Sequence, residues 1–215
     1  RLTGRMVAIN LEPAAISEDA EKDPVWSLTE GRRATVENAK KAADMGVDMI
    51  ILTGNPGIGV SNPAIVHALT ELKEAVGDRV ILTAGKMHAA GVISEGGENI
   101  LTENDVDAFI DAGADILLLP APGTVPGITM EYAHKLIVRA HAKGALAMTT
   151  IGTSQEGADE ATIREIALMC KMAGADIHHI GDSGYMGMAI PDNITAYSIA
   201  IRGKRHTYRR MAMSL

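Results

Sequence analysis

The sequence predicts a (β/α)8 barrel, of which six βα units lie within the 215 residues. Short apolar strand segments return every ~30 to 35 residues, which is the length of one βα unit. A segment with helical periodicity follows each of them. Polar residues come after all six strands, which favours a closed barrel over other α/β folds. We expect one domain over residues 1–215, an incomplete barrel.

A repeated pattern precedes every second strand. Gly, a small or branched residue and Asp stand before an apolar run at Gly46, Gly113 and Gly174, separated by 67 (113 − 46) and 61 (174 − 113) residues. Each Gly suits the left-handed position that ends a helix. The strands expected in chain order are residues 6–10, 49–52, 80–84, 116–119, 145–149 and 177–180.

Capping residues mark the helices between these strands. The expected helix starts, in chain order, are Asn62 as N-cap with Pro63 at N1, Thr102 with Asp105 as a capping box, Thr129 or Glu131, Asp159, and about Pro191. Continuously apolar strands that alternate with helices predict a parallel sheet buried on both faces.

An open doubly wound sheet is the alternative to a barrel. Such a fold has a Gly-rich phosphate turn after its first strand, but here Leu-Glu-Pro follows Asn10. A barrel needs eight strands and we identify six. We therefore expect two further βα units before Arg1 and an unclosed arc within this chain.

Composition restricts the class of protein. A net charge of −7 argues against a nucleic-acid partner, and no apolar run is long enough to span a membrane. The basic stretch at residues 202–210 lies in a helical pattern, where cations near the C-terminus complement the helix dipole. The single cysteine, Cys170, is expected in the core of a cytoplasmic protein.

Chemically useful residues are concentrated at the carboxyl ends of the strands, where a barrel builds its active site. The candidate catalytic residues are Glu12, Lys86, His88, His178 and Asp182. The candidate substrate-binding residues are Asn10, Asn55, Gly152, Thr153, Ser154, Gly181, Ser183 and Gly184.

The last two of these loops have the composition of an anion site. Gly152-Thr153-Ser154 and Gly181-Asp182-Ser183-Gly184 offer hydroxyls and accessible backbone N–H groups. They would be loops seven and eight of a complete barrel, where phosphate commonly binds. Ordinary turns would have the same composition, so both interpretations stay open.

Strand parity suggests which side chains face the barrel mouth. Lys86 and His88 share parity, so both are expected to point inward, with Lys86 as a base or Schiff-base amine. A Lys86 paired with a neighbouring carboxylate is the alternative. His178 shares parity with Asp182 and is preferred as the catalytic histidine, while His179 is expected to pack against a helix.

A divalent ion such as Mg²⁺ is an open possibility. Glu12 and Asp182, with one of the histidines, would supply oxygen and nitrogen ligands. No compact ligand motif such as H-E-x-x-H accompanies them.

The loop motifs resemble an uncharacterised bacterial barrel family over essentially the whole chain. The motifs begin at residues 10, 52, 84, 119, 149 and 178, and include Ala-Gly-Lys-Met-His-Ala-Ala-Gly and His-His-Ile-Gly-Asp-Ser-Gly. Members are sometimes labelled phosphoenolpyruvate phosphonomutase-like or haloacid-dehalogenase-like. The phosphonomutase group carries an acidic Mg²⁺ cluster and a Cys-bearing gating loop, neither of which has its spacing here. The resemblance therefore implies the barrel and the preceding βα units, and transfers no catalytic residue.

These observations favour a lyase or isomerase acting on a small phosphorylated or carboxylated metabolite. Lys86 or His178 would move a proton next to a carbonyl, and Glu12 and Asp182 would orient these groups or bind an ion. A metal-assisted hydrolase of a phosphate ester and a non-catalytic ligand-binding barrel are the alternatives, because barrels host many functions. A homo-oligomer is an open possibility.

Overall fold

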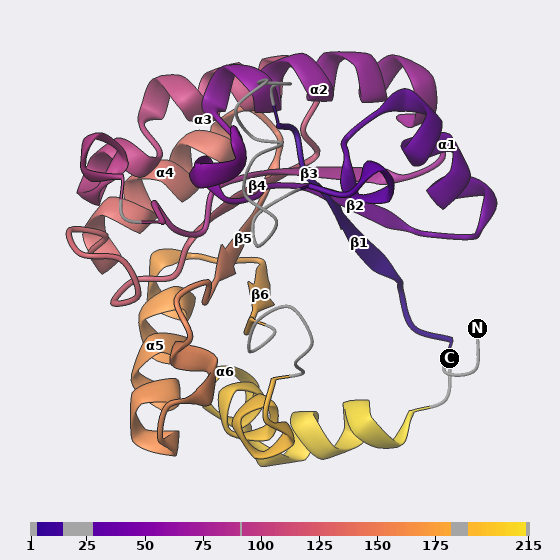
Figure 1. The fold of residues 1–215 in the computed structure, drawn as a ribbon. Helices are drawn as coiled ribbons and strands as arrows, with labels where there is room; N and C mark the ends of the chain where they lie inside the picture. Colours follow the sequence, from indigo (N-terminus) through magenta and orange to yellow (C-terminus); the bar gives the residue numbers. More distant parts are fainter. Residues whose placement is uncertain (1–3, 15–27, 91, 182–188, 214–215) are drawn as a thin grey trace.

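In the computed structural model, which describes residues 4–14, 28–90, 92–181 and 189–213, the chain forms one curled parallel sheet (Figure 1). The strands pair in sequence order, each with the next, and no pairing joins β6 to β1 in the described part of the chain. They are β1 (Ala8–Leu11), β2 (Met49–Leu52), β3 (Ile81–Gly85), β4 (Ile116–Pro120), β5 (Leu146–Thr150) and β6 (Ile177–His179). The expected six-stranded open arc is confirmed.

The helices cover the outer, convex face of the sheet (Figure 1). They are α1 (Val36–Asp44), α2 (Asn62–Val76), α3 (Glu103–Asp111), α4 (Met130–Ala142), α5 (Glu160–Ala173) and α6 (Pro191–Ala212). Short 3-10 turns lie in the loops: η2 (Glu30–Arg32), η3 (Pro56–Ile58), η4 (Ile93–Glu95), η5 (Gly97–Ile100) and η6 (Gln155–Gly157).

Most of the expected helix starts are correct. Thr102, Thr129 and Asp159 are N-caps, and Thr102 forms the full capping box with Asp105. The expected cap at Asn62 is wrong. Ser61 is the N-cap, because its hydroxyl accepts the N–H of Ala64 and its backbone is extended, and Asn62 is the first helical residue.

The two faces of the sheet carry separate apolar clusters. Side chains such as Ile50, Leu82 and Leu117 pack with the helices in the main core. The alternate side chains form an inner cluster without helix residues: Met49, Ile51, Ile116, Leu118 and Met148. A third cluster under α5 and α6 contains Cys170, which is fully buried as expected. Strand alternation therefore assigns every strand residue to the outer or the inner face.

The repeated aspartates tie strands together at their amino ends. Asp48, Asp115 and Asp176 each accept, through a carboxylate oxygen, a backbone N–H of the preceding strand at 2.8 to 2.9 Å. Asp48 and Asp115 also accept an N–H of the following strand through their backbone carbonyls. Each aspartate thus satisfies a backbone donor that the sheet leaves unpaired at this edge.

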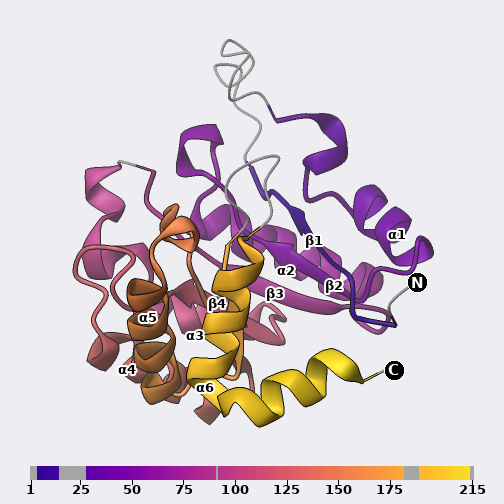
Figure 2. The same ribbon diagram turned by 90° about the horizontal axis from the view of Figure 1, so that it is seen from below.

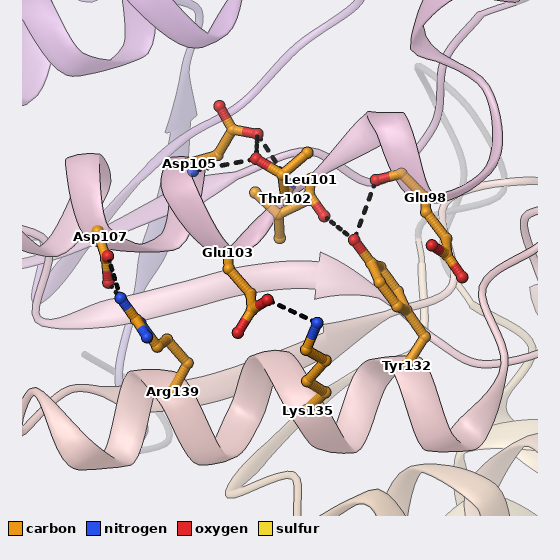
Figure 3. A network of polar contacts seen from close by, with 9 residues as sticks. All are labelled: Glu98, Leu101, Thr102, Glu103, Asp105, Asp107, Tyr132, Lys135 and Arg139. Carbon is orange, nitrogen blue, oxygen red and sulfur yellow. Dashed lines mark hydrogen bonds and ion pairs between the residues drawn. The ribbon is translucent and has the colours of Figure 1, made fainter.

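A row of polar contacts joins α3 to α4 (Figure 3). Lys135 pairs with Glu103, and Arg139 pairs with Asp107, one helical turn further along both helices. At the start of α4 the Tyr132 hydroxyl donates to the carbonyls of Glu98 and Leu101. Because these carbonyls belong to the segment after β3, α4 also holds that segment in place.

The last helix bends and crosses beneath the open side of the arc (Figure 2). Gly203, with φ 77° and ψ 162°, interrupts the helical backbone of α6. Beyond it, the carbonyls of Arg210 and Met213 accept hydrogen bonds from Arg5, which precedes β1. None of the helices in the described ranges is long and apolar enough to cross a membrane.

Candidate active site at the carboxyl ends of the strands

The inner face becomes polar toward the carboxyl ends of the strands. Asn10 lies opposite Ile51 in the β1–β2 ladder, and Glu12 and Thr53 follow two residues later, so all three belong to the inner face. Thr83, on β3, is also inward and has no exposed surface. The Asn10 side-chain amide donates to the Thr53 carbonyl at 3.4 Å. The candidate residues Asn10 and Glu12 thus lie at the carboxyl end of β1, as the strand assignment predicted.

Glu12 is a buried carboxyl with one partner. It is 4% exposed, and its Oε1 is paired with the Arg32 guanidinium. Its Oε2 is buried and has no hydrogen-bond partner in the described structure. Burial raises the pKa of Glu12, although Arg32 opposes this shift. A carboxyl with one oriented and one unpaired oxygen is suited to exchanging a proton or binding a cation.

Two further inward hydroxyls lack partners. The Oγ1 atoms of Thr53 and Thr83 are buried, and neither has a hydrogen-bond partner among the described residues. Leaving a buried hydroxyl unpaired costs stability. Such groups are common where a protein prepares a surface for a ligand or water.

The two histidines of β6 face opposite sides of the sheet, but His179, rather than the expected His178, faces inward. His178 points to the helices, where its Nδ1 lies 3.1 Å from the Tyr197 hydroxyl of α6. His179 points inward, and its Nδ1 lies 2.9 Å from Thr150 Oγ1. The expected inward orientation of His178 is therefore wrong. The two adjacent histidines alternate between the faces, as expected for a strand. The parity that His178 shares with Asp182 did not indicate which of the two faces is the inner one.

Lys86 does not point into the barrel mouth. The residue is 1% exposed, and its Nζ lies 2.7 Å from Glu95 Oε2 in the loop after β3. Met87, not Lys86, packs on the inner cluster, and Lys86 has the parity of Ala84 in the outer core. The alternative in which Lys86 pairs with a neighbouring carboxylate is confirmed. His88 lies in the loop beyond β3, and burial lowers its pKa.

The loop after β5 presents unused backbone donors. In the described part of the chain, no acceptor pairs with the backbone N–H groups of Gly152, Thr153 and Ser154. Ser154 adopts a left-handed φ of 69°, and the Thr153 hydroxyl bonds to Gln155. Successive free N–H groups with a left-handed residue form a concavity that favours anions.

The start of the loop after β6 lies against this donor loop. A side chain at Gly181 would come within 2.5 Å of the Ile151 carbonyl and 3.2 Å of Glu156 Cβ. The two loops therefore meet, as an anion site requires. Asp182, Ser183 and Gly184 lie outside the described residues. Asn55, the remaining candidate, uses its Oδ1 to accept the Gly57 N–H in η3.

Among the described residues, no group of three His, Cys, Asp or Glu side chains is arranged to hold a metal. Of the two proposed carboxylate ligands, Glu12 lies within the described residues, and its Oε2 is unpaired. A site shared with Asp182 stays a prediction.

Sequence reasoning missed four residues of this mouth. They are Thr53, Thr150, Glu156 and His179. His179 could have been found, because Ile177 two residues earlier is the apolar inner-face residue of the same short strand. Nothing in the local sequence distinguishes Glu156, a buried carboxylate beside Gly181, from a surface glutamate.

Comparison with known proteins adds a family and a fold. The family described as "Domain of unknown function (DUF7916)" matches residues 1–215. The match bears on neither the phosphonomutase label nor the dehalogenase label. A search of curated proteins by sequence finds no match.

Several solved aldolases have a similar fold. A tetrameric deoxyribose phosphate aldolase from Aeropyrum pernix is 15% identical, with a TM-score of 0.57, over 92% of this chain and 70% of its own. An archaeal fructose 1,6-bisphosphate aldolase is 14% identical, with a TM-score of 0.55, over 75% and 61%. Another such structure, with its catalytic Lys covalently bound to a carbinolamine intermediate, is 14% identical, with a TM-score of 0.53, over 79% and 61%. The chain thus has the fold of these barrels and spans 61% to 70% of their lengths.

Proposed function

The chain belongs to the DUF7916 family, and we propose that it is a lyase or isomerase that acts next to a carbonyl group in a small phosphorylated or carboxylated metabolite. One observation carries this proposal. A buried carboxyl with an unpaired oxygen, Glu12, and three unused backbone N–H groups at residues 152–154 lie on the same strand-end edge. The aldolase fold of the neighbours supports a lyase in particular.

The unused N–H groups would hold the anionic end of the substrate. Peptide dipoles that converge on a concavity bind phosphate or carboxylate without a fixed positive charge. Gly152 allows the close packing of this loop, since a side chain there would come within 2.6 Å of Met87. The substrate's reactive carbon would then lie over the polar inner face.

Glu12 would exchange the proton. In an aldol cleavage, a base removes the hydroxyl proton, the carbon–carbon bond breaks, and the electron pair passes to the carbonyl oxygen. The resulting enolate then takes up a proton at carbon. Arg32 orients the Glu12 carboxyl, and burial raises its pKa toward the range in which a carboxyl both accepts and donates protons.

Lys86 has no covalent role in this proposal. The iminium route needs an uncharged amine at the substrate carbonyl. The Lys86 amine pairs with Glu95 instead, and Lys86 follows β3, three strands away from β6, on the outward parity. We assign Lys86 to holding the loop after β3.

A metal-assisted hydrolase is the second candidate. The unpaired Oε2 of Glu12 favours it, because a buried carboxylate oxygen without a partner is also a ligand for Mg²⁺. A bound Mg²⁺ would supply Lewis-acid catalysis and an activated water. Asp182 is the second ligand that we propose for it.

The test is cleavage of deoxyribose 5-phosphate and fructose 1,6-bisphosphate, followed by a wider panel of β-hydroxy carbonyl phosphates. Glu12→Gln should lower kcat by about 10²- to 10⁴-fold, the usual contribution of an acid–base group. Glu131→Gln, at an exposed position on α4, is the matched control and should leave kcat unchanged.

Two reagents distinguish the acid–base route through Glu12 from the metal-assisted and iminium routes. EDTA should leave activity intact, and borohydride with substrate should label no lysine. Loss of activity with EDTA, together with hydrolysis of simple phosphate esters, would establish the hydrolase instead. A borohydride adduct at Lys86 would restore the iminium route. Absence of carbon–carbon cleavage across the panel would refute the lyase.

Oligomerisation stays a prediction for this chain. The Aeropyrum pernix aldolase is a tetramer, and we propose that this chain also forms a homo-oligomer. Light scattering across a range of protein concentrations would detect it, and a monomer throughout would refute it.

A further inference from the structure

Glu156 is a buried carboxylate that the proposed mechanism does not use. It is 4% exposed and lies in η6, directly after the unused N–H groups of residues 152–154. In the described part of the chain, no hydrogen-bond donor and no cation pairs with its side chain, and its backbone carbonyl alone accepts a hydrogen bond. Burying a carboxylate without a partner costs free energy. A chain that keeps such a group at a strand-end edge leaves an interaction for a ligand to complete.

The Glu156 side chain is directed toward the end of β6. A Cβ placed at Gly181 would lie 3.3 Å from Glu156 Oε2 and 2.5 Å from the Ile151 carbonyl. Because Ile151 immediately precedes the three unused N–H groups, the carboxylate lies near them, where the loops after β5 and β6 meet. Its oxygens are not fully enclosed, in contrast to Glu12 Oε2, so a ligand can reach them.

Two side chains hold the turn that carries Glu156. The Asn193 amide, buried at the start of α6, donates to the carbonyls of Glu156 and Ala158 at 2.8 and 2.9 Å. The Gln155 amide donates to the Gly123 carbonyl at 3.1 Å, which connects the turn to the loop after β4. The backbone beneath the carboxylate is therefore fixed, which lowers the cost of ordering it around a ligand.

We propose that this junction of the two loops binds a ligand with a protonated amine next to an anionic group. The anionic group would accept from the N–H groups of residues 152–154, and the amine would donate to the Glu156 carboxylate. A ligand with negative charge alone would be repelled by Glu156, whereas an ammonium group is attracted to it. A bound Mg²⁺ is less well supported, because it needs several oxygen ligands and the described residues offer no group of three. The inference names amino acids and amino-bearing phosphates as the substrate class, and so rests on the proposed function.

Calorimetry on the full chain with two pairs of probes tests recognition of the amine. Serine and glycerate differ in an ammonium group in place of a hydroxyl, and so do phosphoserine and 3-phosphoglycerate. The amine of at least one pair should bind about 10-fold or more tightly than its hydroxyl partner. Glu156→Gln should remove this difference by weakening the amine alone. Glu165→Gln, at an exposed position on α5, is the matched control and should leave all affinities unchanged.

The other outcomes separate this inference from the proposed function. Equal binding of amine and hydroxyl, or an equal loss of both in Glu156→Gln, would overturn the inference and leave the anion site intact. Binding of no probe would overturn both. Binding that requires added Mg²⁺ would overturn the amine in favour of a metal. Selective binding of the amine, with no cleavage across the substrate panel, would support the inference and refute the lyase.

The stability of the unliganded chain distinguishes a ligand-binding carboxylate from a structural one. Glu156→Gln removes a buried charge that has no partner, so Tm should rise by about 2 to 4 °C. Saturating phosphoserine or serine should then raise Tm in the unmodified chain more than in Glu156→Gln. An unchanged or lower Tm in unliganded Glu156→Gln would show that the carboxylate stabilises the fold, and would overturn the proposal.

Discussion

Polar side chains at the amino edge of the sheet are hydrogen-bonded, whereas several at the carboxyl edge are not. At the amino edge, Asp48, Asp115 and Asp176 each accept a strand N–H, and Lys73 pairs with Asp115. At the carboxyl edge, Glu12 Oε2 and the Thr53 hydroxyl are buried without partners in the described structure, as is the Thr83 hydroxyl in the middle of β3.

We infer from this difference that the amino edge contributes mainly to stability and the carboxyl edge mainly to function. In barrels, catalytic groups lie at the carboxyl ends of the strands, and the opposite edge contributes to stability. Satisfied groups lower the energy of the fold, whereas unpaired groups leave interactions for a ligand to complete. Substitutions at the amino edge should therefore change unfolding, and substitutions at the carboxyl edge should change activity with little loss of stability.

The largest effect on stability is expected at the amino edge. Asp115→Ala removes the acceptor of the buried Leu82 N–H and the ion pair with Lys73. The free energy of unfolding should fall by about 1 to 3 kcal/mol, the cost of an unsatisfied buried donor. Urea unfolding measures it. Asp115→Asn keeps an acceptor oxygen and should lose less, and an equal loss in both variants would assign the effect to the ion pair.

A gain in stability is expected at Thr83, on the inner face of the sheet. Thr83→Val replaces an unpaired buried hydroxyl with a methyl group, and should raise the free energy of unfolding by about 1 kcal/mol. Thr124→Val is the matched control, since that buried hydroxyl donates to the Ala121 carbonyl at 2.7 Å and its loss should destabilise. Destabilisation by both variants would show that Thr83 has a bound partner, and the contrast between the edges would weaken.

The smallest expected effect is on the pH dependence of the free energy of unfolding. Burial, with a smaller contribution from the Arg202 charge, lowers the pKa of His178, whereas Asp176 opposes the shift. The unfolded ring therefore binds its proton more tightly, so stability is complete above an unfolded pKa of about 6.5 and falls as the pH drops below it. His178→Gln should flatten this fall in unfolding experiments between roughly pH 7 and 5. His67→Gln, at an exposed site on α2, should leave it unchanged, and an unchanged slope in His178→Gln would contradict the assignment.

The sequence predicted the architecture well because its determinants are local. Apolar runs, helix caps such as Thr102 and Asp159, and the repeated Gly-x-Asp pattern depend on short spacings. The error at Ser61 is one residue, because Ser and Asn are both good caps and only the backbone angles select between them.

The candidate residues lie at the strand ends as expected, but the orientations of His178 and Lys86 were predicted wrongly. Parity states that His178 and His179 oppose each other, but which one faces inward depends on the curvature of the sheet and on the partner across it. Similarly, Lys86 was identified as unusual, yet its partner Glu95 lies nine residues later in a loop that α4 holds. Such contacts depend on tertiary packing, which no local pattern encodes.

The aspartate repeat also has a mechanical consequence. Asp48 and Asp115 each fasten three successive strands at one edge, by a carboxylate bond on one side and a carbonyl bond on the other. Because these bonds hold neighbouring strands together at the amino edge, they also help to fix how the strands are aligned where they lead into the polar carboxyl edge.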